Sequence, residues 1–148
     1  MFEEKINDWM IRNGFGDIEV MDDDEFMFEI EEKVIHFGIV SNSEGRWFEQ
    51  FLHEYGLKFS GIADEVLAFL HEIGHSRTMD YFTEADLEED CLAKNVIFFM
   101  DSSCAQMHAY WDLPMEFAAN MWAVDFINSH IDAVNELCAI YKEYNGEV

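Results

Sequence analysis

The spacing of the hydrophobic residues changes near Ser43, and this change constrains the fold more than any other feature. Between Ile18 and Val40, apolar residues alternate with polar ones or form short runs between turn-forming residues, which is typical of β-strands. From Ser43 onward, apolar residues recur every three or four positions, which is the spacing of amphipathic helices. We therefore predict an α+β fold, with a small antiparallel sheet of about three strands packed on a mainly helical core.

Helix boundaries follow from the apolar stripes and from residues that begin or end helices. One helix is expected before the strands, and the chain of 148 residues has a single proline and no linker, so we expect one domain over residues 1–148. The segment 96–101 either ends a helix or forms a short strand. The predicted helices cover Phe2–Asn13, the stripe from Trp47 to Tyr55, Ile62–His75, an acid-rich helix opened by a Thr83–Asp86 capping box and running to Asn95, a helix starting near Asp112 and Pro114, and Ile131–Tyr144.

The charge of the chain is strongly negative, with 32 acidic residues against 8 Lys and Arg and a net charge of −24. Such a surface repels nucleic acids and anionic membranes, whose binding requires clustered cations. It attracts basic proteins or peptides, so we expect a protein or peptide partner; the alternative is that the charge only maintains solubility. The acidic runs at 22–25 and 84–90 are expected to be solvated.

The sequence indicates a cytoplasmic protein. Its first residues lack the basic and then apolar order of a signal peptide, and no apolar run is long enough to span a bilayer. Cys91, Cys104 and Cys138 are odd in number and show no metal-binding spacing. We expect three reduced and buried thiols.

A His-Glu-x-x-His motif is formed by His71, Glu72 and His75. On a helix the two histidines project from one face, where both imidazoles can reach one metal ion at about 2.0–2.1 Å. Glu72 lies about 100° further round the helix, an offset that suits a general base for water activated by the metal. The alternative is that both histidines are ordinary polar positions of an amphipathic helix, whose other face is apolar: Val66, Leu67, Leu70 and Ile73.

Glu116 is the predicted third metal ligand, because its neighbours in the sequence are too apolar for a charge that faces solvent. Asn120 lies one turn further on and could accept a hydrogen bond from an imidazole N–H. Ala119, Ala123 and Gly74 would allow the two helices to approach closely. The alternative role of Glu116 is to favour a helix N-terminus through the helix dipole.

Other side chains compete for roles at this site. Asp80 is the main rival to Glu116 as metal ligand, with Asp86 behind it, because both follow soon after the motif. His108 and Tyr110 precede the Glu116 helix, and either could donate a hydrogen bond to a developing oxyanion or simply form a polar rim of the core. The remaining histidines are expected to be structural or exposed: His36, His53 and His130.

The two motifs, His71-Glu72-Ile73-Gly74-His75 and Glu116 to Ala123, resemble those of small gluzincin-type zinc metallopeptidases, and most of all the ImmA/IrrE-like proteins. The resemblance covers roughly residues 62–128. It implies a zincin-like core, Zn²⁺ held by His71, His75 and Glu116, and Glu72 as general base. Two features depart from the family pattern: about forty residues separate the motifs, and Asn120 stands where thermolysin-like relatives have an acid. We also expect no C-terminal regulatory domain.

These observations lead to one main functional hypothesis and two alternatives. The main hypothesis is a cytoplasmic zinc-dependent endopeptidase that acts on a basic protein, with repressors or other DNA-binding regulators suggested by the resemblance. Its substrate backbone would add as a strand at an exposed sheet edge over 34–40. The first alternative is an acidic DNA mimic or inhibitor whose metal site is structural or absent. The second is a zincin that binds metal without turnover.

Overall fold

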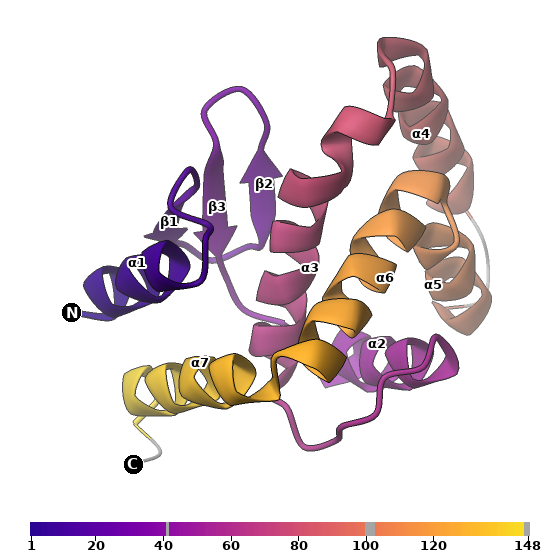
Figure 1. Cartoon of the computed structure of the whole chain (residues 1–148). Coiled ribbons are helices and arrows are strands. Elements are labelled where there is room, and N and C mark those ends of the chain that lie inside the picture. Colours follow the sequence, from indigo (N-terminus) through magenta and orange to yellow (C-terminus); the bar gives the residue numbers. More distant parts are fainter. Residues whose placement is uncertain (41, 100–102, 147–148) are drawn as a thin grey trace.

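A computed structural model describes residues 1–40, 42–99 and 103–146, without the side chains of 42–47 and 103–105. A three-stranded sheet and helix α1 lie on one side of the long helix α3, while α6, α5 and α4 lie on the other (Figure 1). The α+β prediction is confirmed. In chain order the elements are α1 (Phe2–Arg12), β1 (Glu19–Asp22), β2 (Met27–Glu29), β3 (Val34–Phe37), α2 (Asn42–Glu54), α3 (Asp64–Thr78), the short 3₁₀ helix η1 (Met79–Tyr81), α4 (Glu84–Ile97), α5 (Ser103–Trp111), α6 (Pro114–Ser129) and α7 (Ile131–Tyr144).

The sheet is mixed, so the prediction of an antiparallel sheet is wrong for one of its two strand pairs. The strand order is β1-β3-β2, with β2 antiparallel and β1 parallel to β3. The outer edge of β1 bonds to α1, because the Asn7 side chain both donates to the Val20 carbonyl at 2.9 Å and accepts from the Val20 N–H at 2.8 Å. Pairing with α1 occupies the backbone that a neighbouring β2 would otherwise use, so β2 lies on the far side of β3.

The helix predictions are confirmed within a few residues, and one helix was not predicted. The last helix has the predicted bounds, and α4 begins with the predicted capping box, in which Thr83 and Asp86 bond each other's backbone N–H. Residues 96 and 97 extend α4, so the segment starts as helix and not as strand. Helix α5 was missed because its apolar residues follow no clear helical period. Trp47 and Cys104 lie outside the described side chains.

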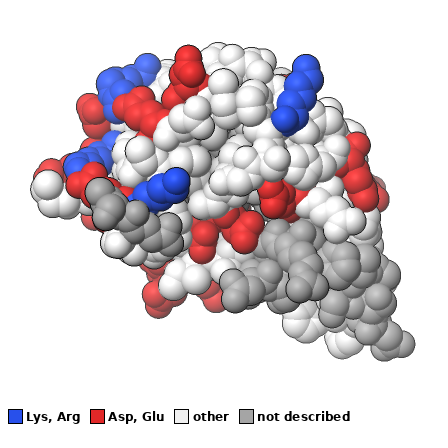
Figure 2. All heavy atoms as spheres, turned by 90° about the horizontal axis from the view of Figure 1, so that it is seen from below, with Lys and Arg blue, Asp and Glu red and all other residues white. Residues whose placement is uncertain are grey.

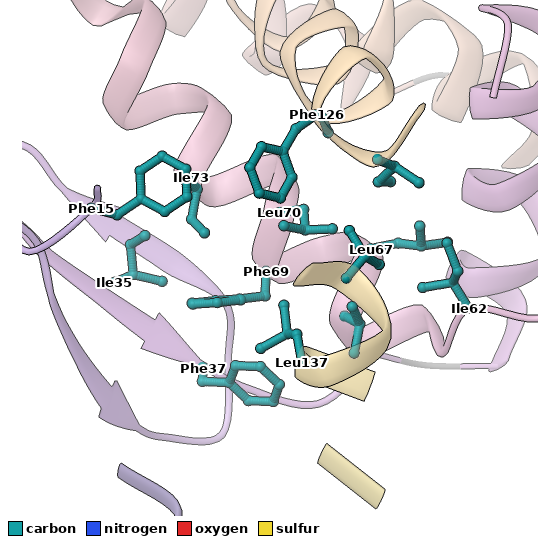
Figure 3. Packing of buried hydrophobic residues seen from close by; sticks show 14 of the residues in the cluster. Phe15, Ile35, Phe37, Ile62, Leu67, Phe69, Leu70, Ile73, Phe126 and Leu137 are labelled. Atoms are coloured by element: carbon teal, nitrogen blue, oxygen red, sulfur yellow. The ribbon is translucent and has the colours of Figure 1, made fainter. Parts of the chain in front are cut away.

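The core surrounds α3, whose buried residues point both to the sheet and to α7 (Figure 3). Phe69 contacts Phe37 of β3, with ring centroids 5.3 Å apart. Leu67 and Leu70 of the same helix are fully buried. Because α3 is buried on nearly all sides, its polar residues require partners within the protein. The predicted apolar face is confirmed: Val66, Leu67, Leu70 and Ile73 are fully buried.

The surface differs from two expectations. Asp22 to Glu25 are exposed as predicted, but Asp90, at the end of the second acidic run, is only 9% exposed. Cys91 is exposed and Cys138 half-buried, so the expectation of buried thiols is wrong for Cys91; both are free. None of the described helices combines the length and apolar character that crossing a membrane requires.

Candidate metal centre

Helices α3 and α6 cross closely at one point, and this contact positions the candidate site. A Cβ on Gly74 would lie 2.5 Å from the Ala119 carbonyl oxygen, so glycine is required at this crossing. Ala119 and Ala123 are fully buried on the facing side of α6. The small residues therefore bring the two backbones together, as the sequence predicts, and place Glu116 opposite the histidines.

His71, His75 and Glu116 converge at this crossing. Each offers one ligand atom, and the three atoms lie within 4.8 Å of one another. Glu116 Oε1 lies 3.2 Å from His71 Nε2, and Glu116 Oε2 lies 2.9 Å from His75 Nε2. Glu116 is 2% exposed, so the carboxylate is almost fully desolvated and requires cationic partners.

Asn120 orients the first histidine. Its Oδ1 accepts a hydrogen bond from His71 Nδ1 at 2.6 Å, and Asn120 is fully buried one turn along α6 from Glu116. A histidine that donates from Nδ1 presents the lone pair of Nε2 to a metal ion. Asn120 Nδ2 is buried and has no partner among the described residues.

The electrostatics of the cluster favour an ionised Glu116. Burial alone would raise the pKa of the Glu116 carboxyl, but hydrogen bonds from His71 and His75 lower it far below its usual range. Burial likewise acts to lower the pKa of His71, and the Glu116 carboxylate more than reverses this and raises it. Glu116 is therefore ionised, and its negative charge stabilises a positive charge on the neighbouring imidazoles.

A cleft of about 890 Å³ opens beside the cluster. Its lining includes His71, Glu72 and Glu116, together with apolar side chains from five other segments. Glu72 therefore faces the same space as two of the candidate ligands. The apolar part of the lining consists mainly of Phe26, Ile39, Val40, Phe48, Met107 and Trp111.

Of the side chains predicted as alternative metal ligands or as oxyanion donors, only Tyr110 lies at the cleft. Asp80 is exposed on η1 and Asp86 caps α4, so neither belongs to the His-His-Glu cluster. His108 packs its ring against Phe51 at 5.2 Å between centroids and is absent from the lining of the cleft. Tyr110 does line the cleft; burial first, and then the Glu116 charge, raise the pKa of its hydroxyl.

The strand edge that we expected to bind the substrate backbone is only partly available. Strand β3 is paired on both sides, so the prediction of an exposed edge over 34–40 is wrong for Val34–Phe37. Residues Ile39 and Val40, which follow β3, do line the cleft. The remaining histidines lie at the surface or in polar contacts: His36 bonds Asp23, His53 contacts the Leu57 carbonyl, and His130 is exposed.

Lys94 and Asp90 belong to this site, and the sequence patterns did not predict them. Lys94 Nζ lies 2.8 Å from Asp90 Oδ2 and 3.5 Å from Glu116 Oε2. Burial acts to lower the pKa of Lys94, but Glu116 and Asp90 raise it above its usual range. One feature of the sequence could have indicated them: Asp90 lies four residues before Lys94, which is the one lysine of an acid-rich helix.

Comparison of the chain with protein family models, with curated proteins and with solved structures finds no match. The resemblance to ImmA/IrrE-like peptidases therefore stays a hypothesis that rests on the two sequence motifs.

Proposed function

We propose that the protein is a zinc-dependent peptidase in which His71, His75 and Glu116 hold the metal. The convergence of two imidazole nitrogens and one buried carboxylate within 4.8 Å is the observation that carries this proposal. Two histidines and a glutamate form one of the ligand sets of catalytic zinc, which leaves a further coordination position for water or substrate.

The hydrogen bonds around His71 support a cation at this point. Because Nδ1 is bonded to Asn120, Nε2 is left to face Glu116 Oε1 at 3.2 Å. An unprotonated nitrogen and a carboxylate oxygen both carry lone pairs, so they require a shared cation between them. A proton fills that role in a metal-free protein, and zinc would replace it with a third donor from His75.

The residues beside the cluster suit hydrolysis of a peptide. Zinc, when bound, supplies a Lewis acid that polarises a carbonyl group and makes water a better nucleophile. Glu72 lines the same cleft, where it can take a proton from the attacking water and return it to the leaving amine. The apolar walls of the cleft can hold hydrophobic side chains of the substrate and exclude bulk water.

The charge of the cleft and surface favours a basic protein substrate. Asp24 and Glu25 are exposed and line the cleft next to its apolar walls. A negative cleft speeds the arrival of basic ligands. Together with the resemblance, this makes DNA-binding regulators in the cytoplasm the substrate class that we propose.

Metal analysis of the purified protein tests the site. We expect one zinc ion per chain in the wild type and in Glu72→Gln, and loss of zinc in His71→Ala and Glu116→Ala, because each removes one of three protein ligands. Asp125→Ala and His53→Ala are matched controls, since both residues are exposed and lie outside the cluster. Zinc retained at full stoichiometry in Glu116→Ala would rule out this ligand set.

Cleavage of a library of quenched fluorescent peptides tests the reaction. We expect cleavage to stop with a zinc chelator, to return with added zinc, and to be lost in Glu72→Gln although this variant keeps its zinc. Zinc-loaded wild type without any cleavage would favour a degenerate zincin. Salt-sensitive binding of a basic DNA-binding protein that is unchanged in Glu72→Gln would favour the acidic decoy.

The distribution of charge gives the decoy less support than the cluster gives the peptidase. A DNA mimic needs carboxylates spaced in a regular row, as phosphates are. On the face drawn in Figure 2, acidic side chains are scattered among neutral ones and lie close to several basic ones.

A further inference from the structure

A lysine in the cleft has no role in the function proposed so far. The chain has only 8 Lys and Arg against 32 acidic residues. Among the described residues that line the cleft, Lys94 is the single Lys or Arg. Solubility alone does not account for this cation, because Lys94 lines the cleft and its side chain is only 32% exposed.

Three contacts hold Lys94 in place. Its ammonium group bonds the buried Asp90 at 2.8 Å, one turn earlier on α4, and approaches Glu116 Oε2 at 3.5 Å. It also lies over the Tyr110 ring, 5.0 Å from the centroid. A buried acid and an aromatic face on either side fix the long side chain toward the cleft, whereas an exposed lysine samples many rotamers.

Neutralising Glu116 does not require Lys94. Glu116 already contacts both imidazoles at 3.2 and 2.9 Å, which are shorter distances than that to Lys94. An ammonium group has three N–H donors. With one directed to Asp90 and a second to Glu116 Oε2 at 3.5 Å, it retains one donor for an oxygen atom that enters the cleft.

We propose that Lys94 is a catalytic residue whose ammonium group donates a hydrogen bond to the carbonyl oxygen of the scissile peptide bond. This inference rests on the proposed peptidase function. When the water oxygen bonds to the carbonyl carbon, the π electron pair moves to the carbonyl oxygen and the water proton passes to Glu72. Lys94 keeps its own proton and stabilises the new oxyanion.

The other predicted oxyanion donors are less suitable. His108 packs against Phe51 and does not line the cleft. Tyr110 lines the cleft, but its neutral hydroxyl is a weaker donor to an oxyanion than a charged ammonium group. Tyr110 is therefore a positioning residue that supports Lys94 through its ring.

Lys94→Met tests the proposal, because methionine keeps an unbranched apolar side chain and removes the charge. The controls are Lys94→Arg, which retains a cation, and Lys58→Met, which removes the same charge from an exposed position outside the cleft. Each zinc-loaded protein is compared with wild type for zinc content, for peptide cleavage, and for affinity towards phosphoryl-Leu-Phe measured by calorimetry. The phosphoryl group carries negatively charged oxygens in a tetrahedral arrangement, as the transition state does.

We expect Lys94→Met to keep its zinc, to lose about 10²-fold or more in kcat, and to bind phosphoryl-Leu-Phe about tenfold or more weakly. Lys94→Arg should recover part of both losses, and Lys58→Met should match wild type. Unchanged kcat and unchanged phosphoryl-Leu-Phe affinity in zinc-loaded Lys94→Met would overturn the proposal. Loss of zinc in Lys94→Met would also overturn it, since Lys94 would then support the metal ligands.

Two further outcomes would also overturn the oxyanion role. If Lys94→Met impairs cleavage only of peptides with a free C-terminal carboxylate and not of their amides, Lys94 anchors that carboxylate and the oxyanion role is wrong. A wild-type protein that binds no zinc would refute the proposed function itself, and the role of Lys94 with it.

Discussion

The α3–α6 pair and the α4 helix contribute to the same cleft but differ in how they are held. Most residues of α3 are buried, and Gly74 packs directly against the Ala119 backbone. Among the described residues of α4, only Asp90 is buried, while Leu92, Val96, Phe98 and Phe99 in and just after the helix are exposed. The candidate metal ligands are therefore fixed by the core, whereas Lys94 is fixed by a few polar contacts on a peripheral helix.

This difference separates two requirements of a metal-dependent site. Ligands must be held to within a fraction of an ångström, which close-packed helices provide. A group that contacts substrate tolerates a more mobile element, and local opening is expected where few apolar contacts are buried. The two regions should therefore differ in stability as their packing implies, and single substitutions can measure that difference.

Phe69→Ala should have the largest effect on stability. Phe69 is fully buried between α3 and the sheet, so we expect a loss of about 3–5 kcal/mol in the free energy of unfolding, measured by urea denaturation. Phe99→Ala is the matched control: Phe99 is 84% exposed, and its removal should change stability by no more than about 0.5 kcal/mol. Equal losses would mean that the region around α4 is packed as tightly as α3.

Gly74→Ala should have the next largest effect, because its Cβ would lie 2.5 Å from the Ala119 carbonyl. We expect a loss of about 1–3 kcal/mol from overpacking, together with weaker zinc binding as α6 moves away from α3. Gly16→Ala is the control, since the nearest atom to its Cβ would be Cγ1 of the Ile11 side chain, at 3.3 Å, and the nearest backbone atom would be Ile11 Cα, at 3.6 Å. Zinc affinity that is unchanged in Gly74→Ala would show that the crossing does not set the ligand geometry.

Thr83→Ala should loosen α4 and leave the core intact. It removes the side chain that accepts from the Asp86 N–H in the capping box, which contributes about 1 kcal/mol. We expect hydrogen exchange of the α4 amides to speed up about fivefold, while exchange of the α7 amides serves as the internal reference. If α3 amides accelerate equally, α4 and the core unfold as one unit.

The smallest predicted effect is the pH dependence of a surface ion pair at the end of α3. The hydrogen bond from Arg77 lowers the pKa of Asp17 below the usual 3.8. The pair therefore stabilises the fold above about that pH, and this stability is lost as the pH falls through the lowered pKa. Asp17→Asn should lower stability by no more than about 1 kcal/mol at pH 7, and by progressively less as the pH falls below 3.8. A difference that grows toward low pH would contradict this sign.

Predictions from the sequence were most accurate where short-range patterns determine the structure. The bounds of α7 follow from its apolar stripe, and the start of α4 follows from the Thr83 capping box. The His71 and His75 positions follow from helix geometry alone. Glu116 was found because a charge within an apolar segment is costly unless it has a partner, and the fold supplies two imidazoles.

Other features depend on contacts between distant segments. Strand pairing is one: β1 pairs parallel with β3 and its outer edge bonds to α1, and strand patterns encode neither contact. The burial of Asp90 is another such feature. No pattern within the run 84–90 sets one acid apart from the other acids, and only the approach of α4 to Glu116 distinguishes Asp90 from them.

By itself the sequence determined every α-helix except α5, the His71–His75 pair on one helical face and the need of Glu116 for a partner. These depend on the helical repeat and on desolvation of a single charge, both of which are local. The tertiary structure alone decided the order of the strands, the convergence of the three candidate ligands and the position of Lys94 in the cleft. Each of these requires knowledge of which distant backbones pack together, and that depends on the shape complementarity of whole elements.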